Sequence, residues 1–389
     1  MDALISGAGI AGPALAYWLD RYGWTTTVVE RASTTRDEGQ NVDVRGAARE
    51  VLRRMGLEET VLAAHTGETG TEFVASDGRV VAAFPAGEGD TAGGTAEAEI
   101  LRGELSRILR EHTPHTEYVL GDRIAAVTED GEVELASGGG GRYDLVVAAD
   151  GLRSSTRALL FPGDPVRELG MYVAYLALPR TATDTTQWRW LTAGRRRNVW
   201  LRPDNLGSVR AGLAFLSDVR GLAELDRAAQ TTILRRTFAD VGWETPRILD
   251  ALDDTPFYFE AVGQTRLPYW SRGRVALAGD AAHCASPISG MSTSLALVGA
   301  YVLAGEVSAD PVHGLRRYEE VLRPYVERAQ KLPPGAPGLL NPRTRVGTAV
   351  LRAGLRVAST AVGLGLDRVF SPPADSFTLP DYAIRARAW

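Results

Sequence analysis

Residues 3–12 read Ala-Leu-Ile-Ser-Gly-Ala-Gly-Ile-Ala-Gly, a short apolar strand that runs directly into three spaced glycines. In a strand-turn-helix unit of this kind, Gly7 permits the tight turn and Gly9 lets a pyrophosphate approach the backbone. Gly12 allows the following helix to pack closely on the strand. This stretch therefore predicts a Rossmann-type unit that holds a dinucleotide.

A second strand and the start of the helix complete this nucleotide motif. Residues 25–29 form an apolar strand that ends on Glu30, whose carboxylate is placed to accept hydrogen bonds from a ribose diol. Arg31 follows it, and Ile10 and Ala11 stand at the helix N-terminus, where backbone N–H groups and the helix dipole favour phosphate. This order of elements favours a nucleotide site over a purely structural glycine-rich turn.

Two later strands also end on an acid. Residues 144–151 read Asp-Leu-Val-Val-Ala-Ala-Asp-Gly, and residues 274–283 read Arg-Val-Ala-Leu-Ala-Gly-Asp-Ala-Ala-His. Asp150 and Asp280 therefore each follow a buried strand, at the carboxyl end where open α/β sheets bind ligands. A carboxylate at that place accepts hydrogen bonds from the hydroxyls of a sugar-like chain.

Composition and charge narrow the class of protein. A chain of 389 residues exceeds the roughly 250–300 residues at which single cores stop growing, so we expect two domains. The net charge of -5 gives no basic footprint for nucleic acid. Cys284 is the sole cysteine and the five histidines lack metal-ligand spacing, so we expect neither a disulfide nor a metal site.

Targeting signals are not evident in the sequence. The N-terminus runs directly into a strand and shows no basic region followed by an apolar core, which predicts a cytoplasmic protein. The apolar stretch of residues 346–366 is interrupted by Arg352 and Arg356, so we expect a packed helix and no stable membrane insertion.

Between residues 168 and 215 the pattern changes from strand-helix alternation to consecutive strands with turn signals. Trp188 and Trp190 are two residues apart and therefore share one face of a strand. Aromatic residues of a half-buried sheet usually pack against helices, but they also suit the lining of an apolar, aromatic ligand site. The candidates for such a lining are Tyr172, Tyr175, Trp188, Trp190, Trp200 and Phe215.

The expected fold class is α/β. A Rossmann-like nucleotide-binding domain comprises residues 1–165 and 263–330, and a mainly antiparallel β-sheet domain for the substrate is inserted at residues 166–262. Residues 331–389 form a C-terminal helical segment and tail.

Together, the three motifs resemble the single-component FAD-dependent aromatic hydroxylases, which have the para-hydroxybenzoate hydroxylase fold. The resemblance covers the chain to about residue 330. It implies that the glycine motif and Glu30 hold the ADP part of FAD. It also implies that Asp150 and Gly151 support both FAD and the reduced nicotinamide, and that Gly279 and Asp280 bind the ribityl chain.

The segment of residues 36–46 and the helix that begins near Arg102 are most similar to the subgroup containing the tetracycline-inactivating monooxygenases. This similarity implies that Asp43 and Arg102 contact FAD and that Arg36 meets the nicotinamide phosphate, with Arg45 as the rival for that role. From the residues alone, Arg102 either decorates its helix or pairs with Asp43.

The loop after the third strand is expected beside the reacting face of the flavin. It contains Pro287, Gly290, Met291 and Ser292. The family usually has Gly-x-Gly after the proline, so Ser292 stands where a glycine is usual.

The resemblance implies a monooxygenase in which NADPH or NADH reduces FAD and a flavin hydroperoxide delivers one oxygen atom to an aromatic or polycyclic small molecule, such as a natural product. Hydroxylation and Baeyer-Villiger insertion both fit, and no catalytic side chain is expected because the cofactor carries the chemistry. The alternatives are a flavin-dependent oxidase or reductase, a halogenase, and a non-catalytic flavin- or metabolite-binding resistance protein. Either a monomer or a homodimer is compatible with the sequence.

Overall fold

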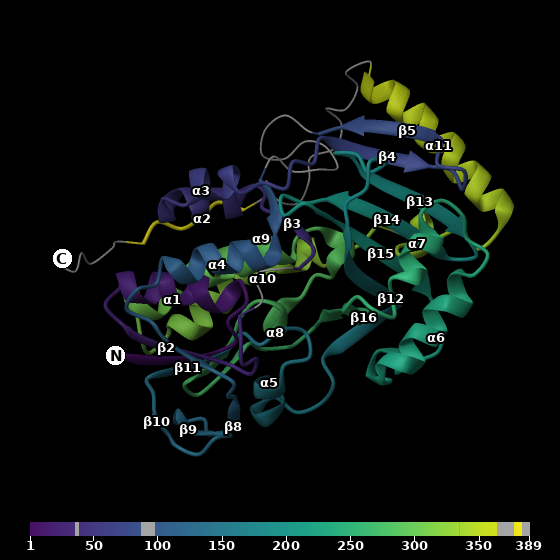
Figure 1. Ribbon diagram of the computed structural model, residues 1–389. Helices are drawn as coiled ribbons and strands as arrows, with labels where there is room; N and C mark the ends of the chain where they lie inside the picture. Colours follow the sequence, from purple (N-terminus) through teal and green to yellow (C-terminus); the bar gives the residue numbers. More distant parts are fainter. Residues whose placement is uncertain (36–38, 87–97, 334, 364–376, 383–389) are drawn as a thin grey trace.

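A computed structural model describes residues 1–35, 39–86, 98–333, 335–363 and 377–382 of the chain. Two large sheets dominate this part of the chain, the first flanked by long helices and the second extending away from them (Figure 1). The expected α/β class, with an inserted, mainly antiparallel sheet and C-terminal helices, is confirmed.

The first sheet has six strands. Their order is β17 (Ser271–Arg272), β18 (Val275–Leu277), β11 (Leu145–Ala148), β1 (Asp2–Ser6), β2 (Thr25–Glu30) and β7 (Glu117–Leu120). All neighbours are parallel except β17 and β18. Strand β11 is buried along its whole length, which is typical of a parallel strand covered on both faces. The carboxyl ends of β1, β2, β11 and β18 therefore meet at one edge of this sheet.

Helices surround the first sheet and pack against one another. They are α1 (Ala11–Arg21), α2 (Ala47–Met55), α3 (Glu58–Ala63), α4 (Arg102–Glu111), α9 (Ser292–Ala309) and α10 (Gly314–Ala329). Helix α9 contacts α1, α2 and α10, and its Tyr301 meets Trp18 of α1 edge-to-face with ring centroids 4.9 Å apart. Among the described helices, α9 alone is long and apolar enough to cross a membrane. Because most of its side chains are buried against these neighbours, α9 serves as the central core helix.

The second sheet has seven strands. Their order is β16 (Phe257–Thr265), β12 (Val166–Pro179), β15 (Ser208–Leu216), β14 (Arg197–Pro203), β13 (Trp188–Gly194), β4 (Gly70–Val74) and β5 (Val80–Pro85). Residues 70–85 fall within the range expected for the first domain, yet they extend this second sheet. Helices α6 (Arg227–Phe238) and α7 (Thr245–Asp250) cover one of its faces, and α11 (Arg345–Gly363) packs on β5 and β13 (Figure 1).

Smaller elements complete the described part of the fold. Strands β8 (Ile124–Val127), β9 (Glu132–Leu135) and β10 (Gly140–Arg142) form a meander, and β3 (Asn41–Asp43) pairs with β6 (Glu99–Leu101). Strand β6 leads directly into α4, which fixes the position of Arg102. The remaining helical segments are α5 (Ser155–Leu160), η1 (Leu222–Glu224), α8 (Asp280–His283), η2 (Pro287–Ser289) and η3 (Gly338–Leu340).

Candidate functional site

The three sequence motifs meet at the carboxyl edge of the first sheet. Gly7 has a φ of +109°, and a Cβ at this position would lie 2.6 Å from the carbonyl oxygen of Ala149, one residue before the Asp-Gly motif. A Cβ on Gly279 would lie 2.7 Å from the Cβ of Ala11. Because any side chain would push these segments apart, the glycines let three distant stretches of chain converge on one place.

The start of α1 leaves room for a phosphate-bearing ligand. A Cβ on Gly12 would lie 2.0 Å from the Gly7 carbonyl oxygen, so only glycine allows the turn to close on the helix. A Cβ on Gly9 would have only the Arg102 guanidinium nearby, at 3.7 Å. Ile10 is the N-cap residue and has no side-chain cap, so the first backbone N–H groups of α1 remain available to an anion.

Glu30 ends β2 beside this turn. One carboxylate oxygen accepts a hydrogen bond from the backbone N–H of Ala8 at 2.9 Å, and the other accepts one from the backbone N–H of Ala32 at 2.9 Å. These bonds fix the orientation of the carboxylate, and each oxygen retains a lone pair for a ribose hydroxyl. The neighbouring Arg31 is exposed.

Asp150 is held by the start of α5. Its carboxylate accepts hydrogen bonds from the Ser154 hydroxyl and, at 3.1 Å, from the backbone N–H of Thr156. Gly151 follows with a φ of +92°, and a Cβ on it would meet no atom within 4 Å, so the backbone conformation alone favours glycine there. Arg157, which the sequence reasoning did not single out, is buried and donates to the carbonyls of Ala281 and Leu152 at 2.9 Å.

Asp280 opens α8 and faces Arg102 from the other side of the site. Burial raises the pKa of the Asp280 carboxyl, while the Arg102 charge acts against that rise. Cys284 and Ser292 lie beside the same carboxyl, with their side-chain sulfur and oxygen 3.9 Å apart. The residue that replaces the usual glycine therefore contributes a hydroxyl next to the predicted ribityl contact.

Of the two interpretations of Arg102, the one in which it pairs with Asp43 is wrong. Asp43 instead forms an ion pair with Arg45 at 3.1 Å and lies 4.0 Å from Arg202. Arg45 is itself buried, and its backbone N–H lies 3.4 Å from the Ser294 hydroxyl of α9. This position suits a link between β3 and α9 better than contact with a phosphate from solvent.

Arg36, the other candidate for the nicotinamide phosphate, lies outside the described residues.

The loop of residues 287–292 follows α8 and reaches the second sheet. Pro287 begins the turn η2, Gly290 has a φ of +65°, and Met291 is buried with its backbone N–H donating to the Ser289 hydroxyl at 3.1 Å. Ile288 packs against the apolar cluster on the second sheet. The loop next to the Asp280 helix therefore reaches the aromatic surface of the second sheet.

Four of the predicted aromatic residues share that surface. Trp190 stacks on Trp200 with ring centroids 5.1 Å apart and planes 13° apart, Trp188 meets Trp190 at 5.3 Å, and Tyr175 meets Trp200 at 6.0 Å. The indole nitrogens of Trp188 and Trp190 are buried without a hydrogen-bond partner. The Arg202 guanidinium lies 4.2 Å from the ring centre of Trp188 and closes one end of the row.

The prediction that Tyr172 and Phe215 line a ligand site is wrong. Their rings stack at 5.7 Å on the opposite face of the sheet, where Phe215 also meets Phe238 of α6. The Tyr172 hydroxyl donates to the carbonyl of Val219 at 3.0 Å. Both residues belong to the core under α6 and α7 because alternate residues of a strand point to opposite faces.

Two groups of charged residues were missed by the sequence reasoning. Arg202 is held at 2.7 Å by both Glu68 and Glu99 beneath the Trp188 ring. Burial raises the pKa of the Glu99 carboxyl to about 7. Glu260 of β16 lies on the aromatic surface, and only its isolation in an apolar strand, Phe-Tyr-Phe-Glu-Ala-Val, could have marked it in the sequence.

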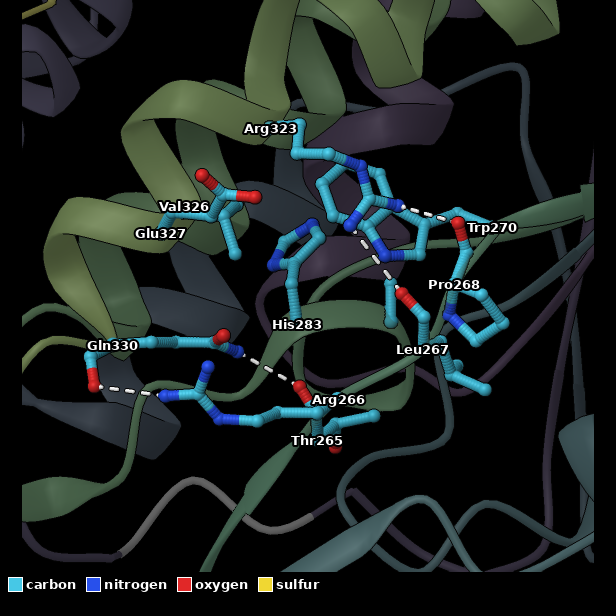
Figure 2. A pocket seen from close by; sticks show the side chains of 11 residues that line it. Thr265, Arg266, Leu267, Pro268, Trp270, His283, Arg323, Val326, Glu327 and Gln330 are labelled. Atoms are coloured by element: carbon cyan, nitrogen blue, oxygen red, sulfur yellow. Dashed lines mark hydrogen bonds between the residues drawn. The ribbon is translucent and has the colours of Figure 1, made fainter.

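A separate pocket of about 280 Å³ is lined in part by His283 of α8 (Figure 2). Its arginines are committed to carbonyl groups, since Arg323 donates to Leu267 and Pro268 and Arg266 donates to Gln330. Burial lowers the pKa of His283 to about 3, so this imidazole is neutral near pH 7. The residues that line this pocket include Ala282 and His283 of α8. None of the glycines of the three motifs lines it, so the pocket is separate from the site at the edge of the first sheet.

Comparisons with known proteins agree with this geometry. Residues 1–331 match the protein family described as an FAD binding domain. A flavin-dependent monooxygenase from an unknown prokaryotic organism is 37% identical over 336 residues, which covers 84% of this chain and 87% of that protein. The flavin-dependent monooxygenase eupH of a Phoma species is 33% identical, with 98% of each chain covered.

Among solved structures, the crystal structure of the tetracycline destructase Tet(51) is similar over nearly the whole chain. The TM-score is 0.80 at 30% sequence identity, with 98% of this chain and 99% of that chain covered. The similarity therefore includes the second sheet and the C-terminal helices as well as the nucleotide-binding half.

Proposed function

The chain belongs to the FAD-binding family of flavin-dependent monooxygenases, and from this premise we propose that it oxygenates a planar, hydroxyl-bearing aromatic or polycyclic small molecule. The observation that carries the proposal is the contact of Ile288 with the aromatic surface of the second sheet. It brings the loop expected at the flavin to the same face of the sheet that carries the stacked rings. Flat apolar surfaces with a few polar groups are typical of small-molecule sites.

The residues of the first sheet suit FAD. The N-terminus of α1 would hold the pyrophosphate, Glu30 would accept from the adenosine ribose, and Asp280 with Arg102 would hold the chain between phosphate and ring. When bound, FAD supplies the redox chemistry that activates O2 with electrons from NADPH or NADH. Asp150 holds α5 in place beside this cofactor.

The protein's own contribution to the reaction is position and exclusion of water. The row formed by Tyr175, Trp200, Trp190 and Trp188 would fix the plane of the substrate, because aromatic rings prefer stacked or edge-to-face contacts. The buried indole N–H groups would donate to an oxygen atom of the substrate. We further propose that the enzyme works in the cytoplasm, as a monomer or homodimer.

A turnover screen tests the proposed function. The FAD-loaded protein is mixed with NADPH and fused-ring phenols, NADPH oxidation is followed by absorbance, and products are analysed by mass spectrometry. We expect at least one phenol to accelerate NADPH oxidation and to gain one oxygen atom. Uncoupled oxidation without product, or no response to any phenol, would contradict the proposed substrate class.

The cofactor assignment has its own test. We expect Asp280→Ala to lose FAD on purification, with the loss of flavin absorbance at a protein concentration where the wild type is yellow. Removing a buried carboxylate that bonds a ligand hydroxyl commonly costs on the order of 2 kcal/mol, roughly a thirtyfold loss of affinity. Asp144→Asn is the control, because Asp144 lies outside the site and pairs with Arg274 at 2.9 Å. An Asp280→Ala protein that keeps its full FAD content would refute the assignment.

A further inference from the structure

Glu260 occupies a distinctive place on the aromatic surface. The register of β16 against β12 sets Glu260 opposite Val173 and Tyr258 opposite Tyr175. Paired residues of neighbouring strands point to the same face of a sheet, so Glu260 shares its face with Tyr175 and the stacked tryptophans. Val173 also packs in the cluster that contains Ile288, which places the acid close to the loop of residues 287–292.

Charged and titratable groups surround the Glu260 carboxyl. The hydroxyls of Tyr258 and Tyr175 interact with it from β16 and β12, Arg102 faces it from α4, and Asp280 faces it from α8. Burial, which is the largest influence, raises the pKa of this carboxyl to about 7. An acid with a pKa near the working pH is suited to exchange protons.

A structural role explains two acids that contact Arg202 of β14 but does not explain Glu260. Glu68 and Glu99 are held at 2.7 Å by Arg202, which compensates their burial. Among the ion pairs of the described residues, none joins Glu260 to an arginine within 4.0 Å. Glu260 is half-buried and has no such ion pair, so its ionised form costs stability, and this cost is typical of functional positions.

We propose that Glu260 is the base that accepts the proton of a substrate hydroxyl on the aromatic surface. This assignment rests on the proposed function and extends it to one residue. The substrate O–H bond breaks, an O–H bond forms on the Glu260 carboxylate, and the electron pair stays on the substrate oxygen. No atom changes its oxidation state in this step. The resulting oxyanion makes the ring more electron-rich and thus a better acceptor of an oxygen atom.

The two tyrosines position this base. The hydroxyls of Tyr175 and Tyr258 interact with the carboxyl, and Tyr175 also contacts Trp200, which links the acid to the ring stack. A planar phenol lying along the tryptophans would therefore bring its hydroxyl to Glu260. The substrate class is thus narrowed to planar molecules with an ionisable phenolic or enolic hydroxyl.

The test uses alizarin, a planar fused-ring phenol whose colour changes when it ionises. Alizarin is bound to the FAD-loaded wild type, Glu260→Gln and Glu260→Asp, and its ionisation is followed by absorbance as a function of pH. We expect the midpoint to rise by about one pH unit or more in Glu260→Gln, because the ionised hydroxyl loses the strong hydrogen bond that the protonated Glu260 carboxyl donates to it after the transfer. Glu260→Asp keeps a carboxyl and should move the midpoint back toward the wild-type value.

Glu72→Gln is the matched control. Glu72 lies in the same sheet and pairs with Arg189 at 3.3 Å, on the face opposite the stacked tryptophans, so the midpoint should not change. Flavin absorbance and thermal unfolding show that each variant is folded and loaded.

The titration and the turnover screen together test whether Glu260 is the base that accepts the substrate proton. An equal midpoint in the wild type and Glu260→Gln overturns it, as does a lower midpoint or an absence of alizarin binding to the wild type. Glu260-dependent ionisation without NADPH oxidation by any phenol would instead reject the proposed function and leave Glu260 as a substrate-binding base. Turnover that is unaffected by Glu260→Gln would reject the assignment alone.

Discussion

The two faces of the seven-stranded sheet are made from alternate residues of the same strands and both are aromatic, yet the polar atoms on their stacked strand residues differ. On the face under α6 and α7, Tyr172, Phe215 and Phe259 stack with nearly parallel rings, and the Tyr172 hydroxyl is satisfied by a carbonyl. On the other face, the indole nitrogens of Trp188 and Trp190 are buried without a partner.

This difference shows that aromatic content alone does not identify a ligand site. Rings stabilise a core and line a pocket equally well, because both roles remove apolar surface from water. Buried polar groups without a partner are costly, and beside a site for a small molecule they suit a ligand that supplies the partner. Substitutions on each face test whether the two faces have these different roles.

Phe215→Ala should destabilise the protein strongly without altering the FAD site. Phe215 is 6% exposed and contacts Tyr172, Phe238 and Phe259, so its removal leaves a cavity under α6. We expect a loss of about 3–5 kcal/mol in the free energy of unfolding, measured by urea denaturation of the FAD-loaded protein. At temperatures where the variant remains folded, its kcat/KM should match that of the wild type. A stable variant with impaired catalysis would reverse the roles assigned to the two faces.

The nucleotide half of the site could be predicted from the sequence because its geometry is local. Gly7, Gly12 and Gly279 stand where the backbone has no space for a Cβ, so glycine at these positions carries the information directly. Strands that end on Glu30 and Asp280 must place those acids at the sheet edge. Spacing along the chain therefore sufficed to bring them together.

The substrate half depends on contacts between distant segments, which spacing does not encode. The sequence places Tyr172 and Tyr175 on opposite faces of one strand, but it does not say that α6 will cover the face of Tyr172. Likewise, nothing local in residues 70–85 shows that β4 will pair with β13. Glu260 becomes notable only when Arg102 and Asp280 approach it from other elements.

Glu260 on the aromatic surface should make the free energy of unfolding depend on pH. The folded protein raises the pKa of Glu260 from its ordinary 4.5 to about 7. Its stabilising contribution is therefore complete below about pH 4.5 and is lost as pH rises through 7. Compared with Glu260→Gln, the wild type should lose about 1–3 kcal/mol of unfolding free energy between pH 5 and pH 8.

Urea denaturation of both proteins across this pH range measures the effect. The pKa of Glu99 is raised in the same direction in both proteins, so its contribution cancels in the difference. A difference that stays constant with pH would show that the Glu260 carboxyl is as well solvated in the folded protein as in the unfolded chain.

The smallest expected effect is the loss of kcat/KM when one indole N–H group is removed from the aromatic surface. Trp190→Phe keeps a ring on the stack but removes an N–H group that we expect to donate to a substrate oxygen. A hydrogen bond of about 0.5–1.5 kcal/mol corresponds to a roughly threefold to tenfold loss of kcat/KM with the phenol found by the turnover screen. Trp243→Phe is the matched control, because the Trp243 indole nitrogen is also buried without a partner but packs with the core under α6 and α7.

The control separates a missing partner in the core from one that the substrate supplies. Trp243→Phe should leave kcat/KM unchanged, because it removes a donor that makes no hydrogen bond and packs away from the stacked tryptophans. Equal losses of kcat/KM in both variants would mean that the substrate does not distinguish the two faces. A loss confined to Trp190→Phe would assign the unpaired nitrogen to substrate binding, since both variants remove the same chemical group.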